Sequence, residues 1–314
     1  MQSGPKIIKH SKTAKPQPFV KWAGGKTRIA PILISYLPKW VVQGDDVCYV
    51  EPFVGGGGLL FNLLDIPGIT NIVINDVNSD LIKTYDMVKN KPNELCQLLD
   101  NFNIEFGRCD NYEARKHYYL IIRDKYNSRS EGDEWQIAAF YFLNHTCFNG
   151  LYRENAQGLF NVPYGKYKAL PKFRSIIEID SCFLKKVDGQ FVDLNDINIP
   201  IGKKHFFFTL DPPYRPLADT TNFNTYHHSG FVDDDQHRLK VFCDNLTHRN
   251  IHWMMSNSYS IDSNGESFFE RLYDNCRIVK IEAPRYINAH VQKRKLEKEL
   301  LIMNYDINGN LLDV

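Results

Sequence analysis

The sequence predicts an α/β protein with a doubly wound, mainly parallel sheet and a mostly helical insertion. A short apolar strand at 47–50 runs into a glycine cluster, and a helix and a second strand at 72–76 follow. Apolar residues then recur at helical spacing in 112–126 and 134–144, and strand-like sequence resumes at 206–210. Strand, glycine turn, helix and strand in this order are typical of the start of a doubly wound sheet. The helical middle predicts an insertion into it.

The remaining elements are predicted one by one along the chain. Residues 1–17 are rich in Lys, Ser and Pro without periodicity and predict a mobile tail. A helix is expected to begin near Lys26 and to end at Pro38, because apolar residues between them recur at helical spacing. Asp80 is expected near the cap of the helix that follows the second strand. The other expected elements are helices at 59–64 and 80–88 and strands at 253–256, 277–282 and 300–305.

These elements divide the chain into three predicted parts. Residues 1–17 form the basic tail, and residues 18–88 together with 172–314 form the α/β domain. Residues 89–171 form the inserted domain, which ends in a loop region rich in Gly, Asn and aromatic residues. Neither an internal repeat nor a low-complexity tract interrupts this division beyond the tail.

Composition excludes several classes of protein. A hydrophobic share of 43% supports a buried core, and no stretch approaches the roughly 18 apolar residues that a membrane span needs. The basic N-terminus has no apolar segment of the kind found in secretion signals. The seven cysteines are scattered without a CxxC pair, which favours reduced thiols in a cytoplasm and predicts neither a zinc site nor a disulfide framework.

The net charge of +1 conceals an uneven distribution of basic residues. Residues 1–44 contain eight Lys and Arg and no acid, and further basic clusters span 153–174 and 285–298. Basic patches on a nearly neutral protein suit a polyanion bound on one face. Solvated surface lysines explain the same clusters equally well, so charge alone leaves the partner open.

The segment 51–58, Glu-Pro-Phe-Val-Gly-Gly-Gly-Gly, predicts a turn that a ligand can approach closely. It does not match the dinucleotide fingerprint, because Leu60 stands where the third glycine of GxGxxG would be. About 20 residues on, Asp76 ends the next strand, where an acid can accept hydrogen bonds from ribose hydroxyls. A nucleoside-containing cofactor is therefore expected, with a turn built only for packing as the alternative.

The segment 21–27, Lys-Trp-Ala-Gly-Gly-Lys-Thr, ends like a phosphate-binding P-loop but lacks the rest of that motif. Val20 occupies the position of its first glycine, and Pro16 and Pro18 break the approach where a strand would precede it. Trp22 and Lys26 near a helix start suggest another use. An indole can stack on a base, and an ammonium can pair with the carboxylate of a methionine-type cofactor.

The most informative motif is Asp211-Pro212-Pro213-Tyr214, which follows the apolar strand 206–210. The prolines restrict the main chain and remove two backbone donors. The Asp211 carboxylate and the Pro212 carbonyl could then accept both hydrogens of an exocyclic amine and direct its lone pair at an electrophile. Tyr214 offers a ring on which an extruded base can stack. The motif indicates methylation of an amino group by positioning and electrostatics, although Pro-Pro turns also follow strands in unrelated proteins.

Together the motifs resemble those of the Dam-like, class alpha DNA N6-adenine methyltransferases, over nearly the whole chain from Phe19 to Tyr305. The matching segments occur in the family's order, and the stretch 215–226 with Gly230 and Phe231 is most similar to the GATC-modifying members of DpnM type. The matching segments are 21–26, 51–57, 75–82, 148–153, 160–165, 211–214 and 256–258.

The resemblance implies a seven-stranded Rossmann-like methyltransferase sheet with an inserted target-recognition domain. It also implies S-adenosyl-L-methionine as the methyl donor, S-adenosyl-L-homocysteine as the product, and no metal. Asp211 to Tyr214 match the motif that receives a flipped adenine. The family positions that bind the methyl donor are matched by Trp22, Lys26, Phe53, Gly55, Asp76 and Asp211.

The resemblance places GATC recognition on the segment 148–153 and on Pro163. Arginine is the usual bidentate partner of guanine, so Arg153 is the expected guanine reader, with a phosphate clamp as the alternative. Asn149 and Leu151 would supply polar and thymine-methyl contacts, and Phe148 and Pro163 complete the set.

The resemblance implies double-stranded DNA as the partner of a cytoplasmic, bacterial or phage-encoded enzyme. A monomer is expected, with a weak dimer as the alternative, and a cognate restriction endonuclease could act on the same site. Two other functions remain open from the residues: an N4-cytosine DNA methyltransferase, whose substrate also presents an exocyclic amine, and a DNA-binding protein without catalysis.

Overall fold

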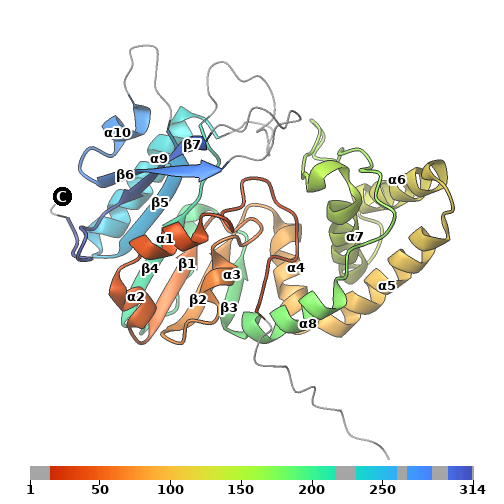
Figure 1. Cartoon of the computed structure of the whole chain (residues 1–314), viewed down its shortest axis with the longest axis horizontal. Coiled ribbons are helices and arrows are strands. Elements are labelled where there is room, and N and C mark those ends of the chain that lie inside the picture. The colour runs from red at the N-terminus through yellow and green to blue at the C-terminus, as the bar shows by residue number, and fades with distance from the viewer. Residues whose placement is uncertain (1–14, 216–230, 260–266, 285–295, 313–314) are drawn as a thin grey trace, which may run out of the picture.

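A computed structural model describes residues 15–215, 231–259, 267–284 and 296–312. Within these ranges the chain builds one seven-stranded sheet in the order β3-β2-β1-β4-β5-β7-β6 (Figure 1). Five neighbouring strands, β3 to β5, are parallel, and β7 runs antiparallel to both β5 and β6. The strands are β1 Val47–Glu51, β2 Ile69–Asn75, β3 Val187–Gln190, β4 His205–Leu210, β5 His252–Ser258, β6 Arg277–Pro284 and β7 Leu296–Met303.

The central strands are buried on both faces, as parallel strands covered by helices must be. All five residues of β1 are buried, and their side chains alternate between two separate cores. Val47 and Tyr49 belong to the larger core, whereas Cys48 and Val50 belong to the smaller one. Because successive side chains of a strand point to opposite faces, one short apolar strand stabilises both layers.

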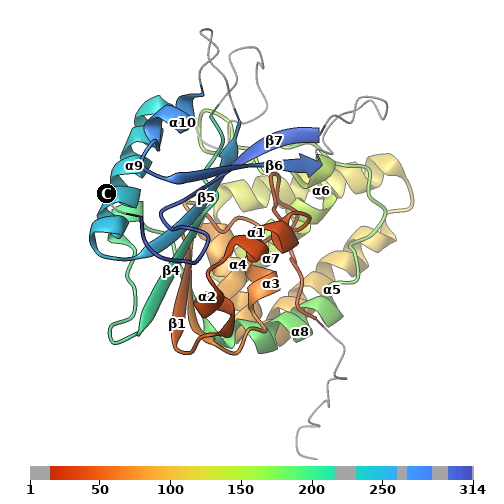
Figure 2. The same cartoon turned by 60° about the vertical axis from the view of Figure 1, so that its left-hand side comes forward.

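Different helices cover the two faces. The larger core contains apolar residues of α1 (Ala30–Tyr36), α2 (Lys39–Gln43), α3 (Leu60–Leu63) and α4 (Ser79–Asn90). The smaller core contains those of α9 (Asp233–His248) and α10 (Phe268–Leu272). Figure 2 shows β7 and β6 beyond β5 at one edge of the sheet, with α9 and α10 near these strands.

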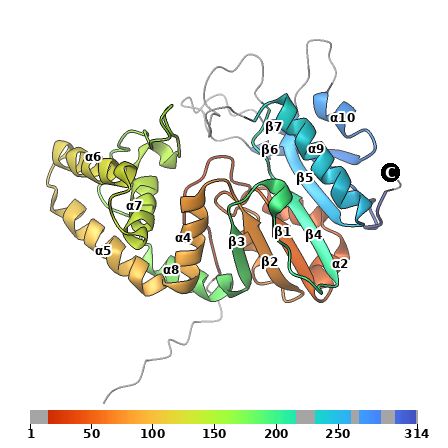
Figure 3. The ribbon, with the colours of Figure 1, turned by 180° about the vertical axis from the view of Figure 1, so that it is seen from behind.

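A group of helices lies beyond the opposite edge of the sheet, past β3 and α4 (Figure 3). It consists of α5 (Pro92–Arg108), α6 (Tyr112–Ser128) and α7 (Asp133–Thr146), and α8 (Arg174–Phe183) leads back to the sheet. Every residue of α7 from Gln136 to Thr146 is buried, as expected of the central helix of a group. A single turn of 3-10 helix, Phe148–Gly150, follows α7 directly.

The predicted fold class is confirmed: a seven-stranded, mostly parallel sheet carries a mostly helical insertion. The helices α2, α5, α8 and α10 and the short strand β3 are additional to the predicted elements, and α9 begins at the acidic run 233–235, which is typical of a helix start. Only one of the four side chains of β3 is buried, so the sequence of this strand shows no apolar pattern that would predict it. The predicted domain boundaries at 17, 88 and 171 stay predictions.

Several predicted boundaries were wrong for local reasons. The helix expected near Lys26 begins at Ala30, because the residues before it form turns against the glycine cluster. Asn78 caps α4 by accepting a hydrogen bond from the Leu81 N–H, and Asp80 lies in the first turn, near the cap as predicted. The last strand begins at Leu296 rather than Leu300, and its charged segment Glu297–Glu299 hides that start.

The described helices include none that is long and apolar enough to cross a membrane. In the same residues no group of three or more His, Cys, Asp or Glu side chains is arranged to hold a metal ion. The residues 216–230, which contribute most of the expected similarity to GATC-modifying enzymes, lie outside the described residues.

Candidate active site

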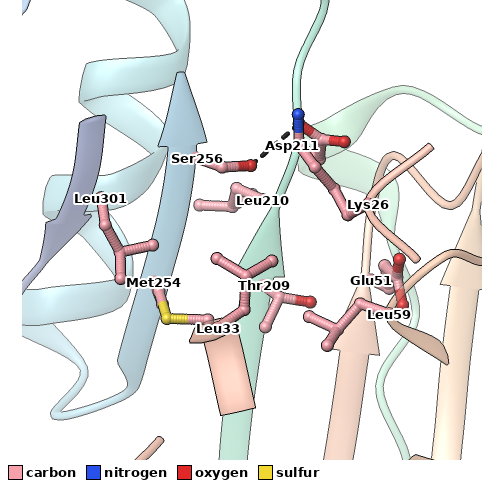
Figure 4. A pocket seen from close by; sticks show the side chains of 10 residues that line it. All are labelled: Lys26, Leu33, Glu51, Leu59, Thr209, Leu210, Asp211, Met254, Ser256 and Leu301. Carbon is pink, nitrogen blue, oxygen red and sulfur yellow. Dashed lines mark hydrogen bonds and ion pairs between the residues drawn. The ribbon is translucent and has the colours of Figure 1, made fainter. Parts of the chain in front are cut away.

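Three acidic residues meet at one edge of the sheet because each stands at the carboxyl end of a parallel strand. Glu51 is the last residue of β1, Asp76 follows β2, and Asp211 follows β4. Ligands of doubly wound sheets bind at this edge, where neighbouring loops diverge. A pocket at this edge is lined by Lys26, Glu51, Thr209, Asp211 and Ser256, together with apolar residues that include one each from α1, β5 and β7 (Figure 4).

Asp211 is held by one hydrogen bond and one ion pair. The Ser256 hydroxyl near the end of β5 donates to its Oδ1 at 2.8 Å, and the Lys26 ammonium lies 3.3 Å from the same oxygen (Figure 4). Desolvation by the surrounding protein raises the pKa of Asp211, against the opposing effects of Lys26 and Ser256. Its side chain remains 28% exposed, so a substrate can reach it.

Lys26 connects three acidic or phenolic groups from distant parts of the chain. Its buried ammonium lies 3.5 Å from Glu299 Oε2 on β7 and donates a hydrogen bond to the Tyr214 hydroxyl. It also lies 4.4 Å from the centre of the Tyr214 ring. Burial raises the pKa of Tyr214 well above its usual range, with further contributions from the Asp211 and Glu299 carboxylates, so the phenol stays protonated.

Glu51, at the end of the neighbouring strand β1, is more deeply buried than Asp211. The Tyr49 hydroxyl donates to Glu51 Oε2 at 2.8 Å and also contacts the Thr209 hydroxyl on β4. Burial raises the pKa of Glu51 to about 8. At neutral pH this side chain is therefore mostly protonated, and it can donate a hydrogen bond towards the pocket.

The glycine cluster is packed against the N-terminal segment. A Cβ on Gly55 would lie 2.7 Å from Trp22 Cδ1, and one on Gly58 would lie 2.5 Å from the Lys26 backbone nitrogen. Gly55 also has a φ of +48°, which disfavours other residues. Asp76 accepts hydrogen bonds from the Gly55 and Asn78 N–H groups at 3.0 Å each and thereby fixes this turn.

The two aromatic residues expected at the cofactor, Trp22 and Phe53, contact other aromatic side chains of this protein. Trp22 stacks on Tyr152 with ring centroids 5.8 Å apart and an interplanar angle of 20°. Phe53 meets Phe231 edge to face at 6.2 Å. No strand precedes Gly25 among the described residues 15–24, which agrees with the rejection of a P-loop.

The segment Asp211–Arg215 after β4 is held by hydrogen bonds to α9. Pro212 is buried and Pro213 is exposed, and the Pro213 carbonyl accepts a hydrogen bond from Gln236 on α9 at 3.4 Å. Arg215 donates two hydrogen bonds to Asp233 at the start of α9, at 2.6 and 2.8 Å. Helix α9 thus determines the course of the chain that carries Asp211 and Tyr214.

The residues expected to recognise DNA gather on a small hairpin after α7. Phe148 donates its N–H to the Pro163 carbonyl at 2.8 Å, and isolated bridges join Cys147 to Tyr164 and Glu154 to Phe160. Phe148, Asn149, Arg153 and Pro163 are exposed, whereas Leu151 is half-buried. Arg153 Nε donates to Asn161 Oδ1 at 2.7 Å, which orients its guanidinium on this surface.

The structure therefore brings the expected residues into two groups. Lys26, Asp211 and Tyr214 meet at the pocket, and Trp22, Phe53, Gly55 and Asp76 lie around the glycine turn beside it. The five expected DNA-recognition residues share the hairpin. Sequence reasoning assigned no role to Glu51, which like Asp211 ends a strand, or to Glu299, whose position only the antiparallel pairing of β7 reveals.

Comparison with known proteins gives a consistent result. The family model of the D12 class N6 adenine-specific DNA methyltransferases matches residues 22–287. A Type II methyltransferase, M.MjaIII of Methanocaldococcus jannaschii, is 42% identical over 92% of this chain and 99% of its own length. The DNA adenine methylase of Escherichia coli K12 is 30% identical over 92% of this chain and 95% of its own. A Lactococcus lactis Type II methyltransferase, M1.LlaDCHI, is 34% identical over 92% and 95%.

Proposed function

Because the chain belongs to the D12 class N6 adenine-specific DNA methyltransferases, we propose that it transfers methyl from S-adenosyl-L-methionine to N6 of a flipped adenine within GATC. That it is an adenine-specific DNA methyltransferase follows from the family. The methyl donor, the flipped base and the target sequence are the proposal. The observation that carries it is the convergence of Asp211, Lys26 and Tyr214 at the carboxyl edge of the sheet.

The residues at this edge fit a methyl donor that has ribose hydroxyls and a methionine moiety. Asp76 would accept from the ribose, as acids after the second strand of such sheets do. The glycine turn allows close approach, Phe53 and Trp22 lie beside it, and Lys26 would pair with the methionine carboxylate. Glu299 Oε2 is buried, lies 3.5 Å from the Lys26 ammonium and makes no hydrogen bond within the described residues, so it could accept one from the ammonium group of a bound methionine moiety. When bound, the donor supplies an electrophilic methyl group on a sulfonium.

The tetrapeptide then acts on the adenine amino group. The ionised Asp211 carboxylate and the Pro212 carbonyl accept its two hydrogens, which turns the nitrogen lone pair towards the methyl group. Tyr214 provides a ring face for the flipped base. The amino nitrogen must lose one proton after transfer, and the raised pKa of Asp211 makes that carboxylate a better proton acceptor than an exposed aspartate.

The hairpin would read the sequence around the adenine. Arg153 reads guanine in the major groove, while Asn149 and Leu151 supply polar and thymine-methyl contacts. Phe148 and Pro163 form the exposed apolar part of the same surface. Lys166, Lys168 and Lys172 are exposed nearby and would contact phosphates.

We further place the enzyme in the cytoplasm of a bacterial or phage-infected cell, acting as a monomer on double-stranded DNA. Two relatives are named as Type II methyltransferases, which supports a partner endonuclease that cleaves the same unmethylated site.

The test uses the purified protein, labelled S-adenosyl-L-methionine and matched duplexes with GATC or with the same bases in another order. We expect label on the GATC duplex only, and N6-methyladenine after digestion to nucleosides. Label on the reordered duplex would refute the target sequence, and N4-methylcytosine would refute the assigned base. Failure to bind S-adenosyl-L-homocysteine in calorimetry would favour a DNA-binding protein without catalysis.

A further inference from the structure

Asn144, near the end of α7, joins two segments that the proposed function assigns to different ligands. Its Oδ1 accepts from the Lys21 N–H and its Nδ2 donates to the Lys21 carbonyl, both at 2.8 Å. The same Nδ2 lies 3.4 Å from the Gly150 carbonyl in the hairpin. One amide thus binds the main chain next to Trp22 and the main chain between Asn149 and Leu151. Asn144 is 2% exposed, so water does not compete for these bonds.

The two segments also touch directly. Gly150 has a φ of +64°, and a Cβ there would lie 2.4 Å from Lys21 Cβ. The Lys21 ammonium donates to the His145 carbonyl at 3.3 Å and lies 4.1 Å from the centre of the Tyr167 ring. Lys21 is therefore enclosed by the end of α7 and by both sides of the hairpin. A displacement of the hairpin has to move Lys21 or break these contacts.

The contact continues to the glycine turn. Tyr152, in the hairpin, stacks on Trp22, and Trp22 in turn lies against Gly55 and Gly56. A Cβ on Gly56 would lie 2.8 Å from Trp22 Cβ. A continuous series of close contacts therefore runs from the exposed hairpin through Asn144, Lys21 and Trp22 to the turn beside the pocket.

We propose that Asn144 is a positioning residue that makes the hairpin and the segment Lys21–Trp22 move as one unit, so that DNA binding and methyl-donor binding strengthen each other. The inference rests on the proposed function, which assigns DNA to the hairpin and the methyl donor to Trp22. DNA that fixes the hairpin also fixes Trp22 against the glycine turn. By linkage, a bound methyl donor must tighten DNA binding by the same factor.

The test measures the dissociation constant of S-adenosyl-L-homocysteine by calorimetry, without DNA and with a saturating GATC duplex. The ratio of the two constants is the coupling factor. We expect wild-type protein to bind at least about fivefold more tightly with DNA. In Asn144→Ala this factor should fall to about one, because the backbone of Lys21 is no longer tied to the hairpin.

Asn304→Ala provides a matched control. Asn304 is also 2% exposed and also holds main chain, since its Oδ1 accepts from the Trp253 N–H at 2.9 Å and its Nδ2 donates to the Ile251 carbonyl at 2.9 Å. Its removal should lower stability comparably but leave the coupling factor at the wild-type value. Equal coupling factors in the two variants would overturn the role of Asn144.

Tyr152→Leu keeps the test decisive if Asn144→Ala does not fold. This variant retains an apolar side chain in the core but removes the ring that stacks on Trp22. Its coupling factor should also fall towards one, and an unchanged factor would overturn the inference. A wild-type protein that methylates GATC without any coupling would refute the inference alone. Loss of binding to S-adenosyl-L-homocysteine would instead refute the proposed function.

Discussion

At the scale of single residues, the pocket places two carboxylates around one lysine. Asp211 and Glu299 both lie within 3.5 Å of the Lys26 ammonium; Asp211 directly follows β4, whereas Glu299 lies in β7. Glu299 raises the pKa of Asp211, whereas Lys26 lowers it. The charge of Asp211 at a given pH is therefore determined by its neighbours as well as by its desolvation.

Replacement of Asp211 tests its proposed role most directly. Asp211→Ala removes the acceptor for an amino hydrogen and should lower kcat by at least about 100-fold, while binding to a GATC duplex stays within about twofold. Single-turnover methylation and fluorescence anisotropy measure the two quantities. Asp188→Ala, an exposed aspartate of β3, is the control and should behave as wild type. Nearly normal turnover in Asp211→Ala would refute the assignment.

Glu299→Gln should change the pH dependence of the reaction. Asp211 must be ionised to accept the amino hydrogens. Because the Glu299 carboxylate raises the pKa of Asp211, its neutralisation lowers that pKa, and the acidic limb of the kcat profile should shift to lower pH. Glu282→Gln, an exposed residue of β6, should leave the profile unchanged. A shift to higher pH, or no shift, would contradict this arrangement.

At the scale of elements, the hairpin after α7 presents exposed side chains on a buried support. Every residue from Gln136 to Thr146 in α7 is buried, and the turn Phe148–Gly150 follows with Phe148 and Asn149 exposed. Asn149 has a φ of +55°, a conformation that asparagine tolerates better than most residues. The support is rigid because it is packed, which suits side chains that must match the edges of bases.

Arg153 and Lys168 on this surface should respond differently to substitution. Wild-type protein should bind a GATC duplex more tightly than a duplex in which that guanine is replaced by another base. If Arg153 reads guanine, Arg153→Ala should reduce this difference in binding free energy by about 1–3 kcal/mol. Lys168→Ala should weaken binding to all duplexes equally, and it should reduce the salt dependence of DNA binding by the equivalent of about one phosphate contact. Competition binding at several salt concentrations separates the two. A uniform loss for Arg153→Ala would identify it as a phosphate clamp.

At the scale of the whole molecule, two buried carboxyl groups in different parts of the fold, Asp180 and Glu51, have raised pKa values. Asp180 on α8 is fully buried and accepts from the Gln17 N–H at 3.1 Å, while its Oδ2 has no hydrogen-bond partner. Burial raises its pKa to about 7. Glu51, in the sheet, has its pKa raised to about 8 for the same reason.

Because of these two carboxyl groups, the free energy of unfolding should decrease as the pH rises. In the folded protein they keep their protons to about pH 7 and 8, whereas in the unfolded chain they ionise near pH 4. Unfolding therefore releases protons, and stability should fall between about pH 4 and pH 8. Asp180→Asn should be more stable than wild type at pH 8 and gain less at pH 5. Urea denaturation at both pH values measures this, and an equal gain at both would refute it.

The sequence by itself determined the order of elements around the glycine turn and the chemistry of the motif after β4. Both are local: short continuous runs of apolar residues specify strands buried on both faces, and Asp211-Pro212-Pro213-Tyr214 is contiguous. The family resemblance, which the family model confirms, also rests on short contiguous segments. Glu51 could have been included on the same ground as Asp211, since it too ends a parallel strand.

Only the tertiary structure decided what surrounds those residues. Glu299 reaches Lys26 because β7 inserts antiparallel between β5 and β6, a pairing that charged residues at its start conceal in the sequence. Asn144 binds Lys21 across 123 positions of the chain, and no periodicity encodes such a contact. The glycine cluster, which sequence explains by access for a ligand, is also required by Trp22 and Lys26. Long-range packing determines these charges and contacts, because they depend on which segments the fold brings together.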